Sequence, residues 1–236
     1  MAELTIHDAV EILGETKVIT SRQAASILPP GKASLPVTNN HIPYTRDRLV
    51  LEADNNTIGT DNRLVYHFGL SLWEWLGILG DDSHIATNIK YDLSDKAHFD
   101  KRHGFWTAPT ERYWATKVSP AGFYLVNFKG CWGRKTWAEQ EKEIANFSGD
   151  YYLRLHTRAP EDVVVQAVFA ICKTHGERLL QDWSHWGPSR DSLGRRVSVG
   201  NFNPGMVVKS ESPSWNCRDN LRACLWQRPA SDIVSQ

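Results

Sequence analysis

The chain has 236 residues, and 27 lysines and arginines balance 27 aspartates and glutamates. Its 41% hydrophobic and 23% charged content is typical of a folded globular protein, which excludes wholesale disorder and fibrous repeats. Because the balanced charge provides no chain-wide positive field, the composition argues against nucleic acid as a partner and predicts no membrane partner.

The amino-terminal residues contain neither the basic region nor the continuous apolar run of a secretory signal. The longest strongly apolar stretch, 163–172, is about half as long as a bilayer span. The four cysteines are too few and too scattered for a disulfide-rich scaffold. We therefore expect a cytoplasmic protein with reduced cysteines, and a single bridge between Cys217 and Cys224 is the alternative.

The first part of the chain has a helical pattern. Apolar residues at helical spacing predict a helix over 5–13, and an N-cap at Thr20 predicts a second, short helix. The run 29–43 is rich in proline and is the best linker candidate, and a third short helix is expected over 45–53.

Strand signals dominate the next part. Residues 63–68 and 123–128 are rich in strand-forming side chains, and a capping box at Thr136 predicts a helix over 137–146. The strongest single element is 161–183, which begins with acidic residues and carries a wide apolar face. We predict that this segment is the core helix.

Three short strands are predicted after the core helix, at 196–200, 206–209 and 221–226. Strands that follow a long helix favour an antiparallel sheet over repeated βαβ units. The predicted fold class is therefore α+β, with an antiparallel sheet packed on one long core helix and a small helical N-terminal part. The expected domain division is a small helical region over 1–55 and an α+β main domain over 56–236.

Ten tryptophans are the compositional oddity of the chain. Core packing explains many of them, because each indole buries a large area. Trp132, Trp186 and Trp215 differ, since they stand in segments rich in glycine, proline or serine. An aromatic side chain in a loop either covers a core edge or presents a flat face to a ligand or partner. The leading hypothesis is a non-catalytic binding or interaction protein that uses these three tryptophans to bind an unknown protein or small ligand.

The densest polar cluster lies at 182–191. In an enzyme, His185 would be the general acid/base, Asp182 or Asp191 would orient it, and Arg190 would stabilise an anionic intermediate. The alternative is that these charges only cap the helix end and bridge the loop. A small hydrolase or transferase is therefore the second hypothesis, and whether the chain is an enzyme stays open.

The third hypothesis is weak DNA binding through the N-terminal helices, since 19–25 resembles the opening helix of helix-turn-helix proteins. Residues 1–62 are net acidic, and prolines stand where a recognition helix should follow, so ordinary helix packing is favoured. No histidine or cysteine pair has the spacing of a zinc site, and no phosphate-binding loop is present. We predict neither a metal nor a cofactor.

Overall fold

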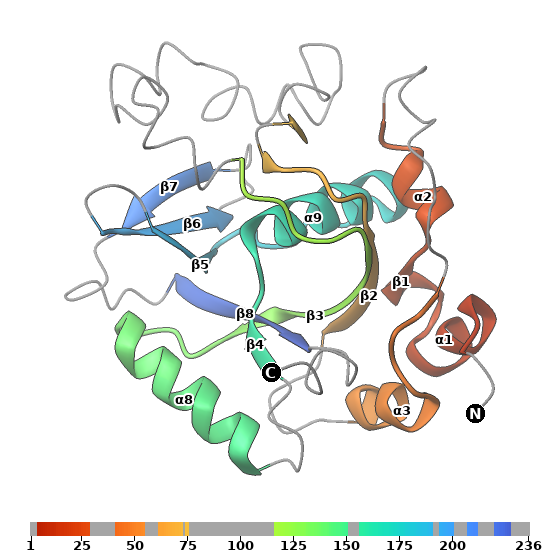
Figure 1. The fold of residues 1–236 in the computed structure, drawn as a ribbon, viewed down its shortest axis with the longest axis horizontal. Coiled ribbons are helices and arrows are strands. Elements are labelled where there is room, and N and C mark those ends of the chain that lie inside the picture. The colour runs from red at the N-terminus through yellow and green to blue at the C-terminus, as the bar shows by residue number, and fades with distance from the viewer. Residues whose placement is uncertain are drawn as a thin grey trace.

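The computed structural model describes residues 4–28, 41–54, 61–72, 74–75, 116–150, 156–190, 194–200, 207–211 and 220–227, with the backbone alone for 148–150 and 207–211. Its helices are α1 (Ile6–Leu13), η1 (Glu15–Lys17, a 3-10 turn), α2 (Ser21–Ala25), α3 (Arg46–Asp54), α8 (Trp137–Asp150) and α9 (Glu161–His175). Its strands are β1 (Val18–Ile19), β2 (Asn62–His67), β3 (Gly122–Cys131), β4 (His156–Arg158), β5 (Ser184–Arg190), β6 (Arg196–Gly200), β7 (Val207–Glu211) and β8 (Leu221–Gln227). Figure 1 shows α1, α2 and α3 gathered on one side of the molecule and α8 on the other.

Within the described residues, eight strands form one sheet in the order β1-β2-β3-β8-β5-β6-β7, and β4 also pairs with β8. Strand β8 pairs in parallel with β5 through its first residues, whereas its last three residues pair antiparallel with β4. Strands β1 and β2 are also parallel. The remaining pairs are antiparallel, so the sheet is mixed.

The prediction of an antiparallel sheet on one long core helix is therefore wrong, although the fold is α+β. Parallel neighbours arise where the connection carries the chain back across the sheet before it pairs again. The connection between β1 and β2 contains α2 and α3, and the connection between β5 and β8 contains β6 and β7. The side-chain pattern of a strand reports its burial and not its direction, which is why spacing alone gave no sign of either parallel pair.

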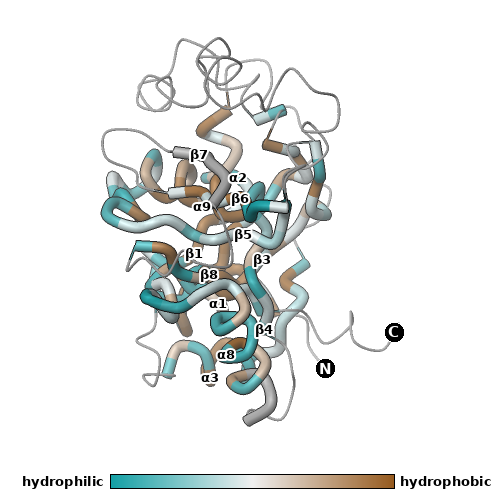
Figure 2. The backbone as a smooth tube through the Cα atoms, turned by 90° about the vertical axis from the view of Figure 1, so that its left-hand side faces the viewer, coloured by the Kyte–Doolittle hydropathy of each residue, from teal (hydrophilic) through white to brown (hydrophobic). Residues whose placement is uncertain are grey.

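Helix α9 is shorter than predicted. It ends at His175, because Gly176 takes the left-handed conformation (φ 69°) and donates its N–H to the carbonyl oxygen of Cys172 (2.9 Å). Every side chain from Glu161 to Ile171 is buried, so this part of the helix has no solvent-facing side. Figure 2 shows the apolar residues concentrated on α9 and on the strands beside it.

The N-terminal elements share the core of α9. The capping boxes at Thr5 and Thr20 begin α1 and α2, which confirms both predicted short helices. Ala9 of α1 and Ile19 of β1 are fully buried in the same apolar cluster as α9. Most of the predicted linker, 29–43, lies outside the described residues.

Helix α8 covers a different face of the sheet from α9. Ala223 and Leu225 of β8 pack in one apolar cluster with Ile144 of α8, whereas Cys224 between them belongs to the cluster of α9. This alternation is the two-residue period of a strand that is covered on both faces. No helix in the described part of the chain is long and apolar enough to cross a membrane. Cys224 is a free thiol, as are Cys131 and Cys172.

Candidate functional site

His185, the predicted acid/base residue, lies in β5 and is 0% exposed. Its Nδ1 accepts from the backbone N–H of Cys224 (3.0 Å), so the ring proton is on Nε2, which donates to the carbonyl oxygen of Ala159 (2.8 Å). Burial, reinforced by the nearby Arg158 guanidinium, lowers the pKa of His185 to about 3. A neutral ring whose two nitrogens both bond to backbone groups exchanges no proton with a substrate at neutral pH. This geometry gives His185 a structural role.

The other predicted catalytic residues are not gathered around His185. Asp182 is exposed in the loop before β5, and Arg190 is exposed at the far end of that strand. At about 3.3 Å per residue, Arg190 lies about 16 Å along the strand from His185. Asp191 lies outside the described residues. The structure therefore does not bring His185, Asp182 and Arg190 together.

Trp186, one of the three predicted ligand-binding tryptophans, lies in β5 and not in a loop. It is 0% exposed and meets Trp137 edge to face, with 5.7 Å between ring centroids and 90° between planes. Leu221 completes this small apolar cluster. The Trp186 indole therefore packs the interior. Trp215 lies outside the described residues.

Trp132 belongs to an unusual turn. Residues 130–135, here called the Trp132 turn, comprise the end of β3 and most of its connection to α8. Gly130 (φ 73°), Trp132 (φ 58°) and Arg134 (φ 62°) all have left-handed backbone. This conformation costs a non-glycine residue about 1–2 kcal/mol and is a genuine outlier for a bulky one. The Trp132 side chain is half-buried and packs edge to face on Phe147 of α8, with 6.3 Å between centroids.

Gln140 holds the Trp132 turn in place from inside α8. Its Nε2 donates to the carbonyl oxygens of Trp132 (3.0 Å) and Leu221 (2.9 Å), and its Oε1 accepts from Nη1 of Arg158 (2.9 Å). Gln140 is 0% exposed, so all these bonds are shielded from water. Strained backbone persists where its surroundings determine it in this way, and such strain is a known mark of functional sites.

The Trp132 turn and the residue before it carry only positive charge. Lys129, Arg134 and Lys135 are its charged residues, and no acidic residue stands between them in the sequence. Lys129 and Arg134 are exposed, and Lys135 forms an ion pair with Glu143 of α8. The turn therefore combines a half-buried indole with two exposed cationic side chains.

An aromatic row continues from the Trp132 turn to a buried ion-pair cluster. Phe147 packs against the ring of His156 on β4, with 4.9 Å between centroids. The His156 Nε2 lies 3.3 Å from Oε1 of Glu52, which also pairs with Nη2 of Arg48 at 2.9 Å. Glu52 is 4% exposed. These contacts join α3 to β4 and close the end of the aromatic row.

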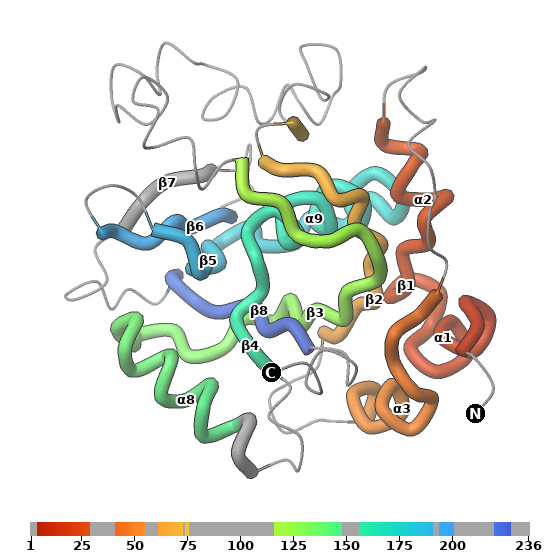
Figure 3. The backbone as a smooth tube through the Cα atoms, in the orientation of Figure 1, coloured from red at the N-terminus to blue at the C-terminus, as the bar shows by residue number. Residues whose placement is uncertain are grey.

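The segment Arg158–Asp162 joins β4 to α9, and Figure 3 traces this connection from β4 into the helix. Three of its residues are bonded to β5, in a set of contacts here called the β5 seam. Arg158 Nη1 donates to the carbonyl oxygen of Trp186 (2.8 Å), and the carbonyl oxygen of Ala159 accepts from His185. Ser189 donates its N–H and its O–H to the two carboxyl oxygens of Glu161 (2.7 and 3.0 Å).

The Glu161 carboxyl is the most perturbed acid of the seam. Glu161 is 5% exposed, and burial raises its pKa to about 7, against the opposing effect of its hydrogen bonds with Ser189. Gly187 of β5 leaves room for it, because a Cβ there would lie 2.1 Å from Oε1. Perturbed acids are frequent in active sites, but Ser189 occupies both oxygens of this one, so the carboxyl acts within the fold.

A serine, a histidine and an aspartate also meet beside α9, but not in the order of a catalytic triad. Asp162 accepts from the N–H and the O–H of Ser119 (2.7 and 2.9 Å), and its Oδ2 lies 3.5 Å from Nε2 of His67. The serine hydroxyl thus donates to the carboxylate and not to the imidazole, which leaves it without the base that activates a nucleophile. Burial lowers the pKa of His67, which is 1% exposed.

Two arginines enclose Trp137. The guanidinium carbons of Arg158 and Arg196 lie 3.7 and 3.9 Å from the centroid of its indole. Burial lowers the pKa of Arg158 to about 10, so this guanidinium stays charged at neutral pH, and its Nε donates to Glu141 (2.9 Å). Both cation–π contacts stabilise the start of α8 and hence the end of the Trp132 turn.

Sequence reasoning missed Gln140 and the role of Glu161. The sequence does contain a signal for Gln140, because it lies three residues after Trp137 and four before Ile144, on the buried face of α8. A polar residue at such a position is a candidate for a buried network. The acidic residues that begin 161–183 predict a helix start, and nothing in the local sequence of Glu161 indicates that β5 passes over it.

No three His, Cys, Asp or Glu side chains are grouped to hold a metal ion in the described ranges. No known family model, curated protein or solved structure matches the chain significantly.

Proposed function

We propose that the chain is a non-catalytic binding protein whose recognition surface is the Trp132 turn. The observation that carries this proposal is the left-handed backbone of a half-buried tryptophan, beside an exposed arginine in the same conformation. The left-handed backbone of these two residues raises the free energy of the folded state, whereas a glycine at either position would adopt it without strain. An indole and an arginine held at the surface are also the side chains that interface hot spots favour.

The charge of the turn favours an acidic protein segment as the partner. Lys129 and Arg134 flank Trp132 in the sequence and are exposed, and Lys135 pairs with Glu143 of α8. A peptide with alternating acidic and apolar side chains would pair with the two cations and cover the indole. Nucleic acid fits less well, because the whole chain has no net charge and specific binding commonly neutralises many phosphates.

The enzyme hypothesis receives less support from the same geometry. His185 has both ring nitrogens bonded to backbone groups, and Ser119 donates to Asp162 instead of His67. Neither arrangement supplies a base beside a nucleophile. Strand β1 lies between α1 and α2, so these two helices are not joined by a helix-turn-helix turn, and the residues where a recognition helix would follow α2 lie outside the described part of the chain.

A binding titration with a defined probe tests the proposal. The probe is a dye-labelled peptide that alternates glutamate and leucine, and fluorescence polarisation reports its affinity. Trp132→Ala and Arg134→Ala should each weaken binding about tenfold or more, because hot-spot truncations cost about 2 kcal/mol or more. Affinity should also fall as salt is added, since the charges lie at the surface.

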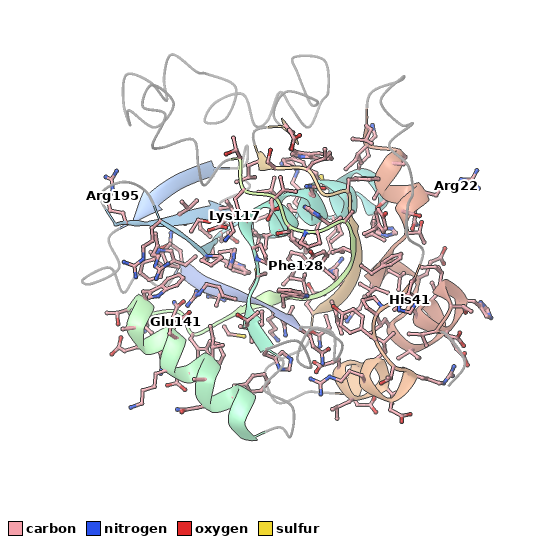
Figure 4. All side chains as sticks on the ribbon, viewed as in Figure 1. Arg22, His41, Lys117, Phe128, Glu141 and Arg195 are labelled. Atoms are coloured by element: carbon pink, nitrogen blue, oxygen red, sulfur yellow. The ribbon has the colours of Figure 1, made fainter. Side chains whose placement is uncertain are left out.

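Arg22→Ala is the matched control. Arg22 is an exposed arginine of α2 that points outward on the side of the molecule opposite α8 (Figure 4), so its loss removes the same charge away from the turn. Binding that is equal in the wild type and in both turn variants would overturn the proposal. Tighter binding of a single-stranded oligonucleotide that also depends on Arg134 would assign the turn to nucleic acid instead.

A further inference from the structure

The β5 seam joins two elements through side chains that are distant in sequence. From β5, His185 and Ser189 donate to Ala159 and Glu161, and Arg158 donates back to the strand at Trp186. The contacts therefore fall along most of the length of β5 and all end on the short segment that begins α9. An opening that frees β5 from this segment must expose Glu161 and His185 together.

We propose that β5 and the β4–α9 junction open as one unit, and that this opening releases a proton from Glu161 and takes up a proton at His185. This inference concerns the stability of the fold and does not rest on the proposed function. It follows from the placement of an acid and an imidazole, both buried, on opposite sides of the same seam.

The two groups respond to pH in opposite directions. The pKa of Glu161 is raised to about 7 by burial, so below that pH the closed seam keeps a proton, with the carboxyl O–H then donating to the Ser189 hydroxyl oxygen, and the open form, with an ordinary carboxyl, releases it. Opening therefore becomes easier as pH rises from about 4.5 to about 7. The pKa of His185 is lowered to about 3 by burial, so opening adds a proton below about pH 6.5 and becomes easier as pH falls.

Between about pH 5 and 6.5 the two effects cancel. The proton that Glu161 loses on opening is matched by the proton that His185 gains, so the number of bound protons does not change and neither does the opening constant. The seam thus keeps a nearly constant stability across this range although it contains two strongly perturbed groups. A change to either residue alone removes the compensation.

Other charged groups face the seam and shift the pKa values of its residues. Asp162 stands beside Glu161 on α9 and raises its pKa slightly, and Arg158 of β4 acts on both Glu161 and His185. Arg196 of β6 acts on Arg158, which also bonds to Glu141 of α8. The arginines stay charged between pH 5 and 6.5, so they contribute no slope there.

Native-state hydrogen exchange of the β5 amides tests the inference. Opening constants are measured from pH 5 to 8 and corrected for the intrinsic exchange rate. The wild type should change little between pH 5 and 6.5, whereas the opening constant of Glu161→Gln should fall about tenfold over that range because only His185 titrates. His185→Gln should show a rise of about tenfold, because only Glu161 titrates.

Glu177→Gln is the control, since Glu177 pairs with Arg63 at 2.6 Å and follows the end of α9 opposite to Glu161. It should leave the pH profile of the β5 amides as in the wild type. The inference is overturned if Glu161→Gln has the wild-type profile. Should His185→Gln fail to fold, Glu161→Gln decides alone, since glutamine keeps the shape of the glutamate and does not titrate: its amide oxygen accepts from the Ser189 N–H, and its amide nitrogen donates to the Ser189 hydroxyl oxygen.

Discussion

Trp132 combines a strained backbone with a side chain at the surface. A substitution there therefore changes the free energy of unfolding and the affinity for a partner by different amounts. In Trp132→Gly the left-handed backbone becomes free of strain, and this gain of about 1 kcal/mol offsets part of the packing that the indole loses against Phe147 and the apolar cluster of Ile144 and Leu225. We expect the free energy of unfolding in urea to fall by about 1–2 kcal/mol, while peptide binding falls about tenfold. A loss of about 3 kcal/mol or more would instead identify the indole as part of the core.

A substitution at Gly187 tests how the Glu161 carboxyl packs against β5. Because a Cβ at this position would lie 2.1 Å from Oε1, Gly187→Ala should destabilise the protein by about 1–3 kcal/mol. Chemical denaturation measures this cost. In a Glu161→Ala background the same substitution should cost much less, since the obstructing side chain is gone. Equal costs in the two backgrounds would contradict the described position of Glu161.

At the scale of single elements, Gly176 ends α9 by conformation alone. Its φ is 69°, and an added Cβ would meet no atom within 4 Å, so Gly176→Ala changes backbone strain without a steric clash. We expect a loss of about 1 kcal/mol, measured by thermal or urea unfolding. No loss would mean that the helix end is not held in the left-handed conformation.

Elements with strong local signals were predicted from the sequence. The capping residues Thr20 and Thr136 begin α2 and α8, and the acidic start of 161–183 is the start of α9. Local chemistry decides these boundaries, because a cap satisfies backbone groups within its own turn.

Strand β5 was not predicted, because its partners are distant in sequence. Its residues, Ser184–Arg190, include Gly187 and Pro188 and have the composition of a loop. The strand exists because β6 and β8 pair with it and the β5 seam holds it. The candidate site was predicted only in part, for the same reason. Trp132 was singled out from its sequence neighbours, but its strain and the support of Gln140 depend on contacts that no local pattern encodes.

At the scale of the whole molecule, the N-terminal elements complete the sheet and the core. Strand β1 pairs with β2, and Ala9 and Ile19 are fully buried in the cluster of α9. We therefore expect the full chain to unfold in a single transition by calorimetry, and residues 56–236 alone to lose most of their stability. A fragment 56–236 that unfolds with the midpoint of the full chain would show instead that residues 1–55 form a separate domain.

The proposed binding function requires that Trp132, and no buried tryptophan, contacts the partner. The most direct measurement is fluorine NMR of protein labelled with 5-fluorotryptophan, in which the resonance of Trp132 is assigned by its loss in Trp132→Phe. Addition of the acidic peptide should shift the Trp132 resonance and leave the resonance of the buried Trp186 unchanged. A saturating titration that leaves Trp132 unchanged would contradict the account.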